Sequence, residues 1–107
     1  LLCYFGRCID VLLTALVRRV KKQADFENKL HYKESNTMNI LSLLQSYFNK
    51  NHICAVIGFK LDYFASESNM AKRYPDTPER LMKVVAILIL EEVIEFEQLT
   101  QYVSNRI

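Results

Sequence analysis

The chain has 107 residues, a formal net charge of +2 and 24% charged residues. This length fits one domain with a core of its own, and a nearly neutral charge favours no class of partner. Two glycines and two prolines are fewer than the turns of a β-sandwich or barrel require. We therefore expect an all-α fold.

The three cysteines, Cys3, Cys8 and Cys54, form no CxxC pair, so we expect neither a disulfide framework nor a zinc site. The longest wholly apolar run, residues 84–90, is far shorter than the roughly 20 residues that span a membrane. The first residue is not Met and no polar tail closes the chain. We expect an excerpt from a longer protein.

Residues 7–20 place apolar side chains at i, i+3, i+4 and i+7, the spacing of an amphipathic helix. The last turns of this helix carry a basic group made of Arg18, Arg19, Lys21 and Lys22, where positive charge suits the helix dipole. A solvated helix end is the preferred interpretation, and an electrostatic contact to RNA or a partner is the alternative. Residues 23–36 are polar and form an uncertain, partly helical linker.

A second helix is expected from a cap at Asn36 or Thr37 through Phe48, and Asn49, Lys50 and Asn51 should end it, because Asn tolerates the left-handed conformation. A third helix follows, with one apolar face made of Ile53, Val56, Ile57, Leu61 and Phe64. Gly58 lies within this helix, and we interpret it as the place where a neighbouring helix approaches closely.

Residues 65–76 are expected to be a plain loop that exposes Lys72 and Arg73, a second candidate contact for RNA or a partner. Thr77 and Pro78 predict the N-cap and first position of a central helix that is apolar around most of its circumference. A tight bend is expected at residues 91–95. A last helix, residues 97–103, should turn four residues inward: Phe96, Leu99, Tyr102 and Val103.

The predicted architecture is about five antiparallel helices, one segment of a helical-repeat scaffold over residues 1–107, although no fixed-period repeat is visible. Such a unit would leave apolar surface uncovered, so we expect the isolated chain to bind an apolar dye and to self-associate.

No chemistry-bearing motif is found. His31 and His52 have no second histidine three or four residues away with which to form a metal pair, and Glu91, Glu92, Glu95 and Glu97 surround the expected bend. Paired acid–base carboxylates need a cleft and different environments, so a solvated corner is the better interpretation. We therefore expect no enzyme, no catalytic or metal-binding residue and no cofactor.

Several strings are similar to the N-terminal region of the THO complex subunit 2 family, in the same order and over nearly the whole chain. The most specific is Gly58-Phe59-Lys60 with its apolar flanks, which resembles a helix centred on Ile/Leu-Gly-Phe-Lys. Upstream, residues 7–13 resemble the family's Arg-x-Leu-Asp-Val-Ile-Leu helix, with Arg7 and Asp10 in the matching places. The rest of the resemblance lies in residues 41–48, 77–78, 84–88 and 93–99. Residues 21–36 depart from the family because the connection looks longer.

The resemblance implies a non-catalytic scaffold segment of the nuclear THO/TREX assembly, which couples transcription and mRNA processing to mRNA export. It implies other THO/TREX subunits as partners, RNA only indirectly, and neither a membrane nor a small-molecule substrate. The alternatives are an unrelated helical protein–protein adaptor and a helical RNA-binding module.

Overall fold

The computed structural model describes residues 4–20, 35–65 and 69–103, and these residues form helices and no strand. Five of the helices have eight residues or more and one, α5, has five. They are α1 (Tyr4–Arg19), α3 (Ser35–Tyr47), α4 (Lys50–Tyr63), α5 (Asn69–Arg73), α6 (Thr77–Leu90) and α7 (Phe96–Val103). The predicted all-α fold is confirmed.

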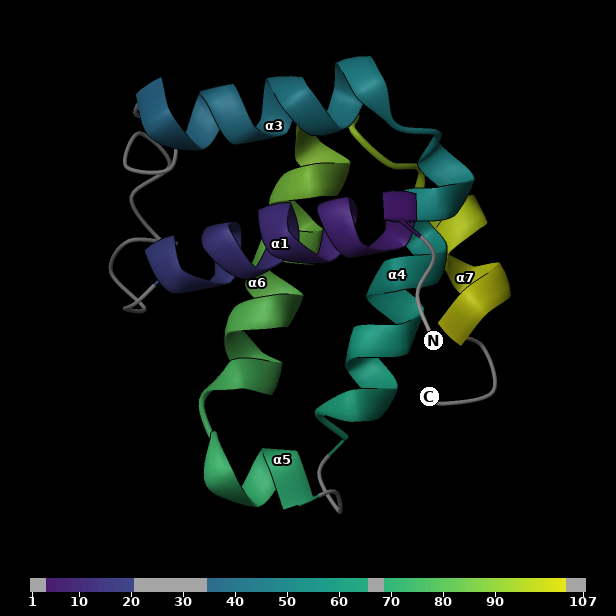
Figure 1. The fold of residues 1–107 in the computed structure, drawn as a ribbon. Coiled ribbons are helices and arrows are strands. Elements are labelled where there is room, and N and C mark those ends of the chain that lie inside the picture. The colour runs from purple at the N-terminus through teal and green to yellow at the C-terminus, as the bar shows by residue number, and fades with distance from the viewer. Residues whose placement is uncertain (1–3, 21–34, 66–68, 104–107) are drawn as a thin grey trace.

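Helix α1 lies across the molecule and packs against α3, α4 and α6, while α4 also packs against α7 (Figure 1). The core between these helices is aliphatic. Its most enclosed large side chains are Ile9, Leu13, Leu16, Leu44, Ile53, Ile57, Leu81, Leu88 and Ile94. Helix α6 contributes five buried residues, which agrees with its broad apolar surface. Because α1 and α4 contact several helices each, the core is not organised around α6 alone.

The predicted face of α1 is confirmed. Ile9, Leu13, Leu16, Val17 and Val20 are buried and Leu12 is partly buried against the same core. The helix begins three residues before the predicted start, and the Val20 amide still donates to the Leu16 carbonyl at 3.2 Å. Most of the uncertain linker lies outside the described residues.

The predicted boundary between the second and third helices is wrong. Asn49 does not close a helix in the left-handed conformation: its backbone is extended, at φ −73° and ψ 138°, and its side chain caps α4. Lys50 and Asn51 therefore belong to α4, and the connection after α3 is two residues long. The expected cap at Asn36 or Thr37 is also wrong, because α3 begins at Ser35 and Thr37 is buried.

The plain loop predicted for residues 65–76 contains α5, and Lys72 and Arg73 lie on it. Met, Ala, Lys and Arg are good helix formers, and the helix stops before Tyr74 because the residue that precedes Pro75 is disfavoured in the α region. Thr77 is not the N-cap of α6. Asp76 takes that position without a side-chain cap bond, and its carbonyl accepts from the Arg80 amide at 3.1 Å.

The bend between α6 and α7 is confirmed. Glu92 has a φ of 60°, and the Val93 amide returns to the Leu88 carbonyl at 2.9 Å. Leu99 and Val103 point inward and Tyr102 is partly buried, as predicted. The prediction that Phe96 points inward is wrong, since this residue is 62% exposed. It is the first residue of α7, and helical side chains lean toward the N-terminus, so this ring extends past the helix pair.

Candidate interaction surfaces

Gly58 marks the crossing of α4 and α7. A Cβ atom built at this glycine would lie 3.2 Å from the Tyr102 Cβ and 3.2 Å from the Tyr102 carbonyl oxygen. These separations are shorter than most Cβ contacts, and the carbonyl is backbone that no rotamer change can move. The predicted close approach at Gly58 is confirmed, and its function is helix packing.

Lys60, two residues further along α4, is buried. Its Nζ donates to the Asp10 Oδ1 at 2.6 Å and to the Thr14 Oγ1 at 3.2 Å, and it lies 5.7 Å from the centroid of the Phe64 ring. Asp10 and Thr14 are one turn apart on α1, so both face the same point of α4. This ion pair was not predicted from the sequence. Its signal was a lysine on the otherwise apolar side of the third helix.

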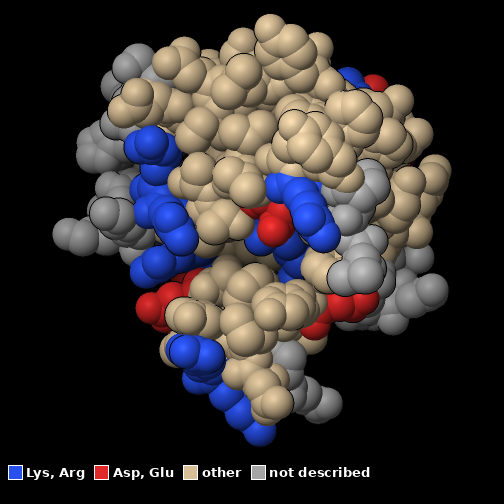
Figure 2. All heavy atoms as spheres, in the orientation of Figure 1, with Lys and Arg blue, Asp and Glu red and all other residues tan. Residues whose placement is uncertain are grey.

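The predicted basic residues do not form one surface. Arg18 and Arg19 are exposed at the end of α1, and Lys72 and Arg73 are exposed on α5. Figure 2 shows Lys and Arg gathered beside the C-terminal end of α1 and again over α5, with acidic side chains between the two groups. Lys21 and Lys22 lie outside the described residues.

Several other cations are already paired. Lys83 lies 3.5 Å from Glu79, one turn away on α6, and Arg80 lies 3.8 Å from Asp76, the N-cap residue one turn before it. These contacts reduce the positive potential between the two basic groups. The guanidinium of Arg73 lies 5.7 Å from the Tyr74 ring centroid, which is the geometry of a cation–π contact.

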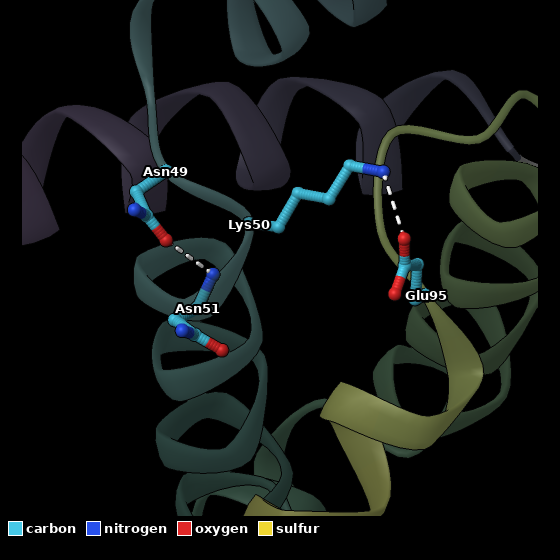
Figure 3. A network of polar contacts seen from close by, with 4 residues as sticks. All are labelled: Asn49, Lys50, Asn51 and Glu95. Carbon is cyan, nitrogen blue, oxygen red and sulfur yellow. Dashed lines mark hydrogen bonds and ion pairs between the residues drawn. The ribbon is translucent and has the colours of Figure 1, made fainter.

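The polar contacts at the start of α4 join it to the segment before α7 (Figure 3). The Asn49 side chain accepts from the Asn51 amide at 2.7 Å, which satisfies one of the free donors of the helix N-terminus. Lys50 Nζ lies 3.4 Å from Glu95 Oε1, and the two side chains are 39% and 62% exposed. One ion pair thus connects the bend between α6 and α7, at Glu95, to the start of α4.

The two described thiols are in different environments: Cys8 is partly exposed and Cys54 is buried. Burial, with a smaller contribution from the charge of Glu95, raises the pKa of the Cys54 thiol from 9.0 to about 11, against the opposing charge of Lys50. Cys54 is therefore a packing residue and not a nucleophile. Within the described ranges, no three His, Cys, Asp or Glu side chains are placed to hold a metal ion.

One helix surface is free of charge. We call it the α3 surface and define it by the exposed residues of that helix, namely Asn36, Asn39, Ser42, Leu43, Gln45, Ser46 and Tyr47. No Asp, Glu, Lys, Arg or His occurs from residue 35 to 49. Figure 2 shows the part of this face over α3 as uncharged, apart from one acidic and basic pair at its edge. This surface was not predicted from the sequence, although the uncharged stretch was its signal.

No helix among the described residues has the length and apolar character that a membrane crossing needs. No model of a known protein family, no curated protein and no solved structure matches this chain. The fold and the surfaces define a small all-helical unit whose distinctive features are helix crossings and an uncharged face.

Proposed function

We propose that this chain is a non-catalytic scaffold segment of the nuclear THO/TREX assembly, where it contributes protein–protein contacts that couple transcription and mRNA processing to mRNA export. The proposal rests on the resemblance to the THO complex subunit 2 family. Other THO/TREX subunits are its proposed partners, and RNA is reached only through them.

One contact carries the proposal. The resemblance depends on two separate strings, one with Asp10 in α1 and the other with Lys60 in α4. Their charged side chains lie 2.6 Å apart in the fold. The contact brings together two of the strings on which the resemblance depends, and it holds α1 against α4. This is the observation that supports the proposal.

The packing of the helices agrees with a scaffold role. Helices α1 and α3 lie side by side, and α4 packs against α7 (Figure 1). Helical-repeat scaffolds are built from such neighbouring helices, and each unit buries its apolar face against the next. An antiparallel, solenoid-like arrangement in the complete protein is part of the proposal.

The test is affinity purification of the tagged protein from nuclear extract. We expect THO subunits to be recovered in stoichiometric amounts. The matched control is Gly58→Leu, which disturbs the α4–α7 crossing and should reduce recovery together with the folded fraction. Recovery of no THO subunit with a folded wild-type protein would overturn the proposal in favour of an unrelated adaptor.

A further inference from the structure

The α3 surface differs from the solvated face that a surface helix normally has. Such faces carry charged residues, and the chain as a whole is 24% charged. Instead, α3 exposes amides, hydroxyls, a leucine and a tyrosine. Tyr47 is 73% exposed and Leu43 is 42% exposed, and they are one turn apart on the same side of the helix.

Aromatic residues extend this surface onto α1. Phe48 follows Tyr47, and its ring lies 6.4 Å from that of Phe5 in an edge-on arrangement. Phe5 in turn lies 5.8 Å from Tyr4. Phe5 and Tyr4 are 57% and 76% exposed. The C-terminal end of α3 is therefore surrounded by rings, which expose much apolar area without a charge on α3.

The absence of charge and the exposed tyrosine are two features of a protein interface. Charged residues are depleted in the centre of an interface, where they would lose their hydration, and tyrosine is enriched there because a rigid ring buries a large area. Nucleic acid is disfavoured as the occupant, since the α3 surface offers no lysine or arginine to a phosphate. An acidic or basic peptide is disfavoured for the same reason, as it would find no opposite charge.

The spacing on α3 suits a helix. Asn39, Leu43 and Tyr47 form a ridge of residues four apart, and the small side chains of Ser42 and Ser46 form a shallow row beside it. Packing of helices places the ridge of one into such a row of the other. No strand among the described residues offers an edge for strand addition.

We infer that the α3 surface docks an uncharged amphipathic helix of a protein partner, with Leu43 and Tyr47 as its anchors. The partner helix presents aliphatic or aromatic residues to these anchors and small polar residues to Ser42 and Ser46. The inference rests on the proposed scaffold function only in expecting a protein partner, and it adds the position and chemistry of one contact.

The test is site-specific photo-crosslinking in the complete cellular protein. A p-benzoylphenylalanine replaces Tyr47 in one variant and Tyr74 in the control. Tyr74 is 46% exposed and directly follows α5, which lies at the opposite end of the molecule from α3 (Figure 1). The adducts are identified by peptide sequencing. We expect the Tyr47 variant to crosslink to a helical segment whose contacting face has no Asp, Glu, Lys or Arg. Adding Leu43→Lys should lower the adduct yield by about tenfold or more, since an anchor residue contributes at least that much.

Met82→Lys is the matched substitution, because Met82 is also an exposed apolar residue, 52% exposed on α6. Met82→Lys should leave the yield of the Tyr47 adduct unchanged. If Leu43→Lys prevents folding, Ser46→Lys replaces it and should lower the adduct yield in the same way. The inference is overturned if the Tyr47 variant gives no more protein adduct than the Tyr74 control. It is also overturned if the adduct forms on RNA, on a charged segment or on a second copy of this chain. An uncharged helix from a protein outside the THO assembly would support the inference and contradict the proposed function.

Discussion

The ammonium of Lys60 and the carboxylate of Asp10 lie 2.6 Å apart, although the two residues are separated by 50 positions in the sequence. The pair joins α4 to α1. Its two members differ in their access to water, since 10% of the Lys60 side chain is exposed against 38% for Asp10. This difference in exposure decides which of the two charges destabilises the fold more when its partner is removed.

We expect Asp10→Asn to destabilise the fold more than Lys60→Met. Loss of the carboxylate leaves an enclosed ammonium without a counter-charge, at a cost of about 1–3 kcal/mol once partial hydration is allowed for. Loss of the ammonium leaves a carboxylate that water can reach, and the methionine keeps the apolar stem, so this change costs about 1 kcal/mol or less. Urea unfolding of the two variants measures the difference.

The control for this pair is Glu95→Gln, which removes the partner of the more exposed Lys50 and should change stability by about 0.5 kcal/mol or less. The double variant should cost less than the sum of the single ones, because the residues interact directly. Equal single costs would show that the Lys60 ammonium is hydrated.

A second prediction concerns Gly58. Leucine at this position must displace the Tyr102 backbone of α7, at a cost of roughly 1–3 kcal/mol. Alanine gains about 1 kcal/mol of helix propensity, but its Cβ crowds the Tyr102 carbonyl at 3.2 Å, so we expect a net change within about 1 kcal/mol of zero. Thermal or urea midpoints of both variants measure this. His52→Leu, on an exposed position of the same helix, should shift the midpoint little, and equal midpoints for the two leucine variants would mean that α7 moves freely.

The sequence predicted the helices with long apolar periodicity well. The face of α1, the broad apolar surface of α6 and the bend after Leu90 follow from burial patterns that local sequence records. Helix ends were less predictable. Asn49 is compatible with ending one helix or capping the next, and only the short connection after α3 decides between these.

Contacts between distant residues were the least predictable. The glycine at position 58 suggested a close crossing, but nothing in the sequence named Tyr102 as the opposing residue. The Lys60–Asp10 pair depends on how α1 crosses α4, and a lysine inside an apolar pattern does not identify its partner. The α3 surface was equally hard to predict, because its signal is an absence of charge and not a motif.

A third prediction follows from the buried thiol of Cys54. In the folded protein an alkylating reagent should modify Cys8 well before Cys54, because Cys54 is enclosed and its raised pKa keeps it protonated. Mass spectrometry of a Cys3→Ser variant, labelled over time at pH 8, measures both rates. Equal rates would show that α4 opens rapidly.

The same thiol should make stability depend on alkaline pH. Its pKa is raised from 9.0 to about 11 in the fold, so between these values the unfolded chain loses a proton that the folded chain keeps. Stability therefore falls as pH rises through this range, by up to about 2–3 kcal/mol. Cys54→Ala should be less stable at neutral pH but show a shallower decline, and unfolding at pH 8 and 10.5 compares the two. Parallel declines would assign the effect to tyrosines and lysines instead.

A fourth prediction compares the two polar contacts at the start of α4. Asn49→Ala removes the cap and should cost about 1 kcal/mol. Glu95→Gln removes the ion pair with Lys50, whose side chains are 39% and 62% exposed, and should cost about 0.5 kcal/mol or less. Urea midpoints at low and high salt measure both, and only the Glu95 effect should vary with salt. If Glu95→Gln destabilised the protein more than Asn49→Ala, the ion pair between Lys50 and Glu95 would be the contact that holds the start of α4 in place.

The last prediction separates a scaffold from an RNA-binding module. Lys50, Lys60, Arg80 and Lys83 are held in ion pairs, and the basic groups at the end of α1 and on α5 are separated by acidic side chains (Figure 2). Each group can contact only a few phosphates, so we expect a dissociation constant for single-stranded RNA no tighter than about 10⁻⁶ M at physiological salt. Titration at two salt concentrations measures the affinity and its salt dependence.

Substituting Gln for both Lys72 and Arg73 should weaken RNA binding modestly and lower the salt slope by at most about 1.4, which corresponds to two phosphate contacts on a single strand. Lys50→Gln is the matched control, because that lysine already contacts Glu95, and it should leave the slope unchanged. Submicromolar affinity that collapses with salt and depends on Lys72 and Arg73 would contradict the prediction. It would make the α5 group a nucleic-acid contact, and the RNA-binding alternative would then replace the scaffold proposal, since a segment that reaches RNA only through its partners has no need of such affinity.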